Sequence, residues 1–78
     1  MTNLPTKTES RINYDLFTHW ETNDLKENFE FMLAKTYLNK EDTIALPLVR
    51  QHLLERGEVE WVKEVHWEIT EMKKEGVL

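Results

Sequence analysis

Apolar side chains recur every three or four residues over 58–75, and this period predicts an amphipathic helix. The stripe that would pack on a core consists of Val59, Val62, Val65, Ile69 and Met72, with Trp61 at its edge. The opposite side carries a row of glutamates: Glu60, Glu64, Glu68, Glu71 and Glu75. Trp67 departs from this pattern, because it points almost directly away from Val65 and Ile69.

Residues 43–56 predict a further helix, whose apolar stripe is Leu46, Val49 and Leu53. Asp42 or Thr43 is expected to cap the start of this helix. Pro47 is expected to fall within its first turn, where the missing N–H would have no helical partner in any case.

Gly57 is expected to separate these two helices. On one continuous helix, the centres of the two apolar stripes would lie roughly 150° apart, so that one core could not cover both. A glycine just beyond the last turn also ends a helix readily, because it adopts the left-handed backbone conformation at little cost. Residues 43–75 therefore predict an αα-hairpin.

A central helix is predicted over residues 24–39, after a turn and helix cap at Thr22-Asn23-Asp24. Its main apolar stripe is Leu25, Phe29, Met32 and Leu33, flanked by Tyr37. A second apolar patch on the far side consists of Phe31, Ala34 and Leu38. Two apolar faces predict a helix that is covered from two directions.

The segment 11–21 is open to two interpretations. Ile12, Leu16 and Trp20 recur at every fourth position, as on a helix, whereas Ile12, Tyr14 and Leu16 alternate, as on a strand. Trp20 and Phe17 fit only the helix, so a short helix is preferred. Residues 1–10 are polar, contain a proline and show no period, and they predict a flexible tail.

The predicted fold is all-α: a small single-domain bundle of three to four helices over residues 11–78, with an αα-hairpin at its C-terminal end. The 78 residues are close to the size at which a core only just offsets the entropy lost on folding. Hydrophobic residues make up 40% and charged residues 32% of the chain, which is typical of a folded globule.

The cytoplasm is the expected compartment. No apolar run approaches the ~20 residues that would span a bilayer, and the N-terminus lacks the layout of a signal peptide. The chain also contains no cysteine, which excludes disulfides and thiolate metal sites.

The residues that most often carry catalysis are sparse, and no enzyme activity, cofactor or metal is expected. His19, His52 and His66 fall in separate segments, and none has another histidine three or four residues away. Ser10 is the only serine, and the only two glycines are too few for a phosphate-binding loop.

The net charge of −5 is concentrated in one half of the chain, with −1 over residues 1–40 and −4 over residues 41–78. Helix, glycine turn and helix over 46–74 also suggest a helix-turn-helix, whose second helix would enter the DNA major groove. That helix would present its glutamates to phosphates, so direct binding of nucleic acid is not expected. No membrane contact is expected either.

Trp67 and the charged side chains around it are the strongest candidates for a functional site. Exposed tryptophans are typical of interface hot spots, although the N-terminal segment could cover this ring or Lys63 could stack on it. The glutamates would either meet a basic partner or form a solvated face that keeps the protein soluble. The predicted partner-binding residues are Trp67, Glu60, Glu64, Glu68, Glu71, Lys63 and Lys74.

The leading functional hypothesis is a non-enzymatic protein-binding module. It would act as a small acidic adaptor, regulator or inhibitor that binds another protein, one with a basic surface, through the outward face of the last helix. The alternative is a structural or assembly subunit, a homo-oligomer whose exposed apolar residues are buried by self-association.

Overall fold

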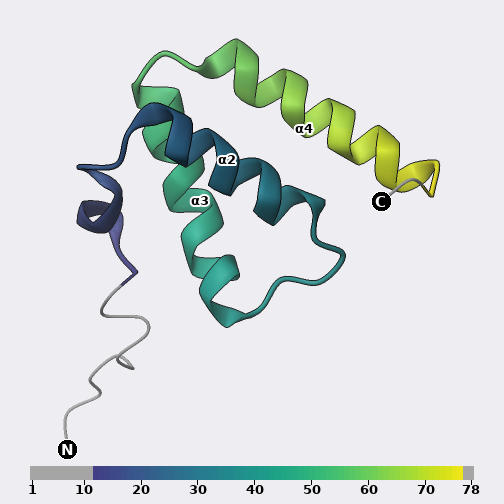
Figure 1. Ribbon diagram of the computed structural model, residues 1–78, viewed down its shortest axis with the longest axis horizontal. Helices are drawn as coiled ribbons and strands as arrows, with labels where there is room; N and C mark the ends of the chain where they lie inside the picture. Colours follow the sequence, from purple (N-terminus) through teal and green to yellow (C-terminus); the bar gives the residue numbers. More distant parts are fainter. Residues whose placement is uncertain (1–11, 77–78) are drawn as a thin grey trace, which may run out of the picture.

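The computed structural model describes residues 12–76, which form one 3₁₀-helix, η1, and three α-helices, α2, α3 and α4 (Figure 1). The prediction of a small all-α domain is therefore confirmed, and residues 12–76 contain no strand. α2 packs on both α3 and α4, and η1 packs on α3. The predicted flexible tail, residues 1–10, lies outside the described residues, as do Arg11 and residues 77–78.

η1 spans only Tyr14–Phe17, so the short helix predicted over 11–21 is found, but as one 3₁₀ turn with narrower bounds. The 3₁₀ turn is capped by Asn13, whose side chain accepts a hydrogen bond from the backbone N–H of Leu16 at 3.1 Å. The predicted inward position, Leu16, is 44% exposed, whereas Phe17 is 3% exposed and joins the core. The helical interpretation is therefore correct in kind and the strand interpretation is wrong, although Phe17 and not Leu16 makes the core contact.

Polar side chains near the end of α3 explain why η1 does not continue as an α-helix. His52 Nε2 lies 2.7 Å from the carbonyl oxygen of Tyr14, and Arg56 donates to the carbonyl of Phe17 at 3.3 Å. The Tyr14 hydroxyl donates to the carboxylate of Glu55. These contacts engage carbonyl groups that a longer helix would use internally, and they attach η1 to α3.

The hydrogen bond from Tyr14 to Glu55 shifts the pKa of both groups. It is the main reason why the pKa of Glu55 lies below its ordinary value of 4.5 and why the pKa of Tyr14 lies above its ordinary value of 10.0. The folded chain therefore favours the glutamate carboxylate and the neutral phenol.

Replacing Tyr14 with phenylalanine should lower the free energy of unfolding by a margin that depends on pH. The contribution of the Glu55 carboxylate is complete above pH 4.5 and is lost as the pH falls through its lowered folded-state pKa. The contribution of the Tyr14 phenol is complete below pH 10.0 and is lost as the pH rises through its raised folded-state pKa. Urea unfolding of both proteins across this range measures the margin, and a margin that stays constant from about pH 3 to about pH 11 contradicts the expectation.

α2 spans Thr22–Ala34, so it begins before the predicted cap at Asp24 and ends well before residue 39. Its N-cap is Glu21, which makes no side-chain capping bond. Its buried residues are Leu25, Phe29 and Met32. Leu33, which was predicted on the same stripe, is only half-buried.

The predicted second covered face of α2 is also wrong, because Phe31 is 66% exposed. The helix ends where Lys35 takes an extended conformation, with ψ at 138°. The following loop leaves Tyr37 82% exposed but turns Leu38 against the core. Lys35 also reaches forward to Asp42, with its Nζ 2.6 Å from a carboxylate oxygen, which ties this loop to the next helix.

α3 spans Lys40–Glu55 and is capped by Asn39, whose side chain accepts from the N–H of Asp42 at 2.8 Å. The predicted caps, Asp42 and Thr43, therefore lie inside the helix. Pro47 lies in the helix interior instead of the first turn, and it leaves the carbonyl of Thr43 without an N–H four residues ahead. Both Pro47 and Thr43 are exposed, so water can bind this carbonyl.

The break predicted at Gly57 is confirmed, since this residue has a φ of 87°. Its N–H donates to the carbonyl of Leu54 at 3.1 Å, and the N–H of Glu58 donates to the carbonyl of Leu53 at 2.9 Å. This pair of bonds is the Schellman arrangement that ends a helix at a left-handed glycine. From this turn α3 and α4 run in different directions (Figure 1).

α4 spans Val59–Lys74 and presents the predicted apolar stripe to the core. Val62 and Val65 are buried, whereas Val59 and Met72, near the two ends of the helix, are 38% and 41% exposed. The stripe therefore packs best at its middle. Within residues 12–76, the buried apolar core is Phe17, Leu25, Phe29, Met32, Val49, Leu53, Val62 and Val65.

Candidate protein-binding surfaces

Trp67 lies on the outer side of α4 with 66% of its surface exposed. Two residues advance a helix by about 200°, so Trp67 faces away from Val65, which is 9% exposed. On the helix surface its nearest neighbours are Lys63 and Glu64, one turn earlier, and Thr70 and Glu71, one turn later. The ring therefore stands among charged side chains, on the side of α4 opposite the core.

Neither of the two arrangements that could have covered Trp67 is found in residues 12–76. Lys63 makes no cation–π contact there, and the lysines that do so are Lys26, over the ring of Trp61, and Lys35, over the ring of Phe31. The N-terminal residues from 12 to 21 include η1, which packs on α3. Residues 1–11, which could also cover the Trp67 ring, lie outside the described part of the chain.

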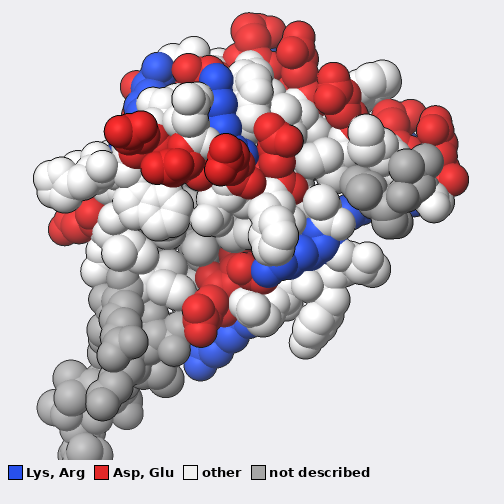
Figure 2. Space-filling view, in the orientation of Figure 1, with Lys and Arg blue, Asp and Glu red and all other residues white. Residues whose placement is uncertain are grey.

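The predicted glutamates also lie on the surface. Glu60, Glu64 and Glu68 are exposed, and Glu71 is half-buried. Figure 2 shows acidic groups along α4 and over α2. Among residues 12–76, the one ion pair on this face joins Lys74 to Glu71, with 3.4 Å between Nζ and the carboxylate oxygen.

We use the name Trp67 face for the outer side of α4, which consists of Trp67, Glu60, Glu64, Glu68, Glu71, Glu75, Lys63 and Lys74. The five glutamates and two lysines give this face a net charge of −3. It combines one large apolar side chain with an acidic surround. Such a surface can make an apolar contact at its centre and charged contacts at its rim.

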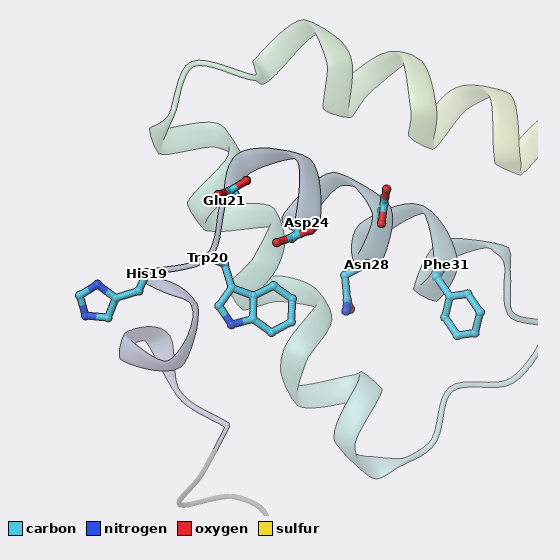
Figure 3. Close-up of a pocket in the computed structure, with 7 residues that line it drawn as sticks. His19, Trp20, Glu21, Asp24, Asn28 and Phe31 are labelled. Carbon is cyan, nitrogen blue, oxygen red and sulfur yellow. The ribbon is translucent and has the colours of Figure 1, made fainter.

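A second candidate surface, which sequence reasoning missed, lies where η1 leads into α2 (Figure 3). It is an open groove of about 580 Å³, here called the α2 groove, and it is lined by His19, Trp20, Glu21, Asp24, Glu27, Asn28 and Phe31. Trp20 is half-buried, and its ring meets the ring of Phe17 edge-on at a centroid distance of 5.0 Å. This contact with a core residue fixes one wall of the groove.

The α2 groove is acidic. Glu21, Asp24 and Glu27 are exposed, and none of them forms an ion pair with another residue between 12 and 76. The start of α2 contributes a partial positive charge of about half a unit, which is far less than three carboxylates. The groove therefore has an excess of negative charge beside two aromatic rings.

One signal in the sequence could have indicated this groove. Asp24, Asn28 and Phe31 stand at i, i+4 and i+7, which places them on one side of α2. The apolar period instead places Phe31 in a covered patch with Ala34 and Leu38, and this prediction separates the ring from the polar residues on the same side of α2.

The three histidines do not come together. His19 lines the α2 groove, His52 is buried beneath η1 at 4% exposure, and His66 is exposed on α4. No three histidine, aspartate or glutamate side chains between residues 12 and 76 are arranged to hold a metal ion. In the same part of the chain, every helix is too short or too polar to cross a membrane.

Comparison with known protein families, curated proteins and solved structures finds no match to this chain.

Proposed function

We propose that this chain is a non-enzymatic protein-binding module that contacts its partner through the Trp67 face. The observation that carries the proposal is the position of Trp67, which is 66% exposed and lies opposite the buried side of α4. In this role Trp67 is the apolar anchor. The charged residues that surround it and meet the partner are Glu60, Glu64, Glu68, Glu71, Lys63 and Lys74.

The energy available from Trp67 is large enough to anchor a contact. A tryptophan side chain buries about 200 Å², and covering the two thirds that are still exposed contributes on the order of 3 kcal/mol at about 25 cal/mol per Å². Each exposed ion pair contributes only about 0.2–1 kcal/mol. Trp67 therefore dominates the affinity, while the glutamates select the charge of the partner and speed its approach.

The acidic surround supports a partner with a basic surface. With a net charge of −5, the chain is attracted at long range to proteins that bind nucleic acid or other polyanions. An adaptor, regulator or inhibitor that occupies such a surface is the version of the proposal that this charge favours. We propose the cytoplasm as the compartment, since a chain without cysteine suits a reducing environment.

Self-association is the second candidate, and a set of exposed apolar side chains favours it: Phe31, Tyr37, Trp67 and Met72. Two copies that met through the Trp67 face would, however, bring together two surfaces that each carry a net charge of −3. Their repulsion opposes this contact most strongly at low ionic strength. A basic partner has no such penalty, so the contact between different proteins is the better supported proposal.

Trp67→Ala should weaken binding of the partner about tenfold or more and leave the fold intact. Tagged wild-type protein and variant are compared in a pull-down, the protein that the variant fails to retain is identified by mass spectrometry, and its dissociation constant is measured with purified components. Tyr37→Ala is the matched control, because Tyr37 is an exposed aromatic on the loop between α2 and α3, at 82% exposure.

Equal dissociation constants for wild type and a folded Trp67→Ala variant overturn the proposal. Sedimentation at several concentrations separates the two candidates. A monomer that binds another protein supports the module, and an oligomer that dissociates in the Trp67→Ala variant supports self-association instead.

A further inference from the structure

The α2 groove combines features that suit a cationic side chain. Figure 3 shows Asp24 and Asn28 between the rings of Trp20 and Phe31, with His19 beyond Trp20. The volume of about 580 Å³ accommodates one or two side chains of a bound segment. The carboxylates of Asp24 and Glu27 are on the same stretch of α2, one turn apart.

We propose that the α2 groove is a second binding site, separate from the Trp67 face, for a peptide segment of a partner protein that carries an arginine beside an apolar residue. The negative charge of the groove favours a positively charged occupant, because the carboxylates of Glu21, Asp24 and Glu27 have no cationic partner within residues 12–76. An arginine offers those carboxylates several N–H donors at once.

The aromatic walls distinguish the two ends of the groove. Lys35 already holds its Nζ 4.9 Å from the centre of the Phe31 ring. Trp20 has no cation on its ring within residues 12–76. A guanidinium group therefore stacks best on Trp20, next to Asp24, while Phe31, 66% exposed, meets the apolar neighbour.

Asn28 adds a polar group to the floor of the groove. Its side chain is half-buried and forms no hydrogen bond with any residue between 12 and 76. The amide oxygen can accept from the arginine or from the peptide backbone. This hydrogen bond would orient the bound segment along α2, from Trp20 towards Phe31.

The three tryptophans allow a direct test with the full chain. A short amidated peptide with two arginines around one leucine is titrated into ¹⁵N-labelled protein, and the indole N–H signals of Trp20, Trp61 and Trp67 are followed. The expected result is a shift of the Trp20 signal, with Trp61 and Trp67 unchanged. A peptide with glutamates in place of the arginines should shift none of them.

Paired charge-removing variants give the quantitative test. Asp24→Asn combined with Glu27→Gln should raise the dissociation constant about fivefold. Glu30→Gln combined with Glu41→Gln removes the same charge from exposed positions that belong to neither candidate surface, and should change it less than about twofold. Both pairs lie at exposed positions, and circular dichroism confirms that each variant is folded.

Three results would overturn the α2 groove as a binding site. One is an equal effect of the two variant pairs, which would show attraction by net charge alone. Another is a shift of Trp67 in place of Trp20, which would move the contact to the proposed site on α4 and support that site instead. The third is the absence of any indole shift at millimolar peptide, and this result leaves the proposal for the Trp67 face untouched.

Discussion

Replacing Phe29 with alanine should lower the free energy of unfolding by about 3–5 kcal/mol. Phe29 is 1% exposed and lies on α2, the helix that packs on both α3 and α4. Its ring also lies 6.0 Å from the ring of Trp61 on α4, so the substitution empties the contact between these two helices. A domain of this size has a total stability of only about 4–12 kcal/mol, and the variant should therefore be partly unfolded at 37 °C.

Phe31→Ala is the matched control for this prediction. It removes the same side chain from the same helix two residues later, but Phe31 is 66% exposed, and the expected loss is below about 1 kcal/mol. Urea unfolding followed by circular dichroism measures both variants. Similar losses for Phe29→Ala and Phe31→Ala would show that the burial pattern of α2 is not the one described above.

The period of apolar residues along the chain correctly predicted the helices that bury one continuous apolar side. α4 was predicted almost to the residue, because Val62 and Val65 repeat with the helical period and no other segment competes for its backbone groups. Gly57 was predicted because the phases of two stripes conflict there, and a left-handed glycine resolves the conflict.

The N-terminal segment could not be predicted in the same way, since its conformation depends on distant residues. Tyr14 meets His52 and Glu55, which are 38 and 41 positions away along the chain. The period of apolar residues contains no information about such polar contacts. The end of α2 at Ala34 was missed because Phe31 and Leu38 share a helical face in the sequence, whereas in the structure one is exposed and the other is turned to the core by a loop.

The same distinction applies to the candidate surfaces. The outward direction of Trp67 followed from its phase relative to Val65 on one helix, and the structure places it there. The α2 groove needs Trp20 to stand beside α2, and the position of Trp20 is determined by η1 and by the ring of Phe17. A surface on one element can be predicted from sequence, whereas a groove between two elements requires the fold.

His52→Ala should lower the free energy of unfolding by about 2–4 kcal/mol, the largest loss expected from any polar residue of the core. His52 is 4% exposed and stacks on Tyr14 with 4.0 Å between ring centres. Because a carbonyl oxygen only accepts, the Nε2 that lies 2.7 Å from the carbonyl of Tyr14 must carry the hydrogen. The substitution therefore removes a buried ring and one of the hydrogen bonds that attach η1 to α3.

Two controls separate the ring of His52 from its hydrogen bond. His52→Phe keeps an aromatic ring against Tyr14 but cannot donate to its carbonyl, so its loss should be smaller, about 1–2 kcal/mol. Gln51→Ala changes the preceding residue, which is exposed. Within residues 12–76 its side chain hydrogen-bonds only to Glu55, at 3.3 Å, so this substitution should cost less than about 0.5 kcal/mol.

Loosening η1 should also disturb the α2 groove, because Trp20 lies three residues after the end of η1 and packs on Phe17. In folded His52→Ala protein the indole N–H signal of Trp20 should shift, while the signal of Trp67, on the far side of α4 from the core, should not. A Trp20 signal that is unchanged while stability falls would show that the groove keeps its shape without η1. A shift confined to Trp20 would show that a single buried histidine on α3 positions the aromatic wall of a groove on α2.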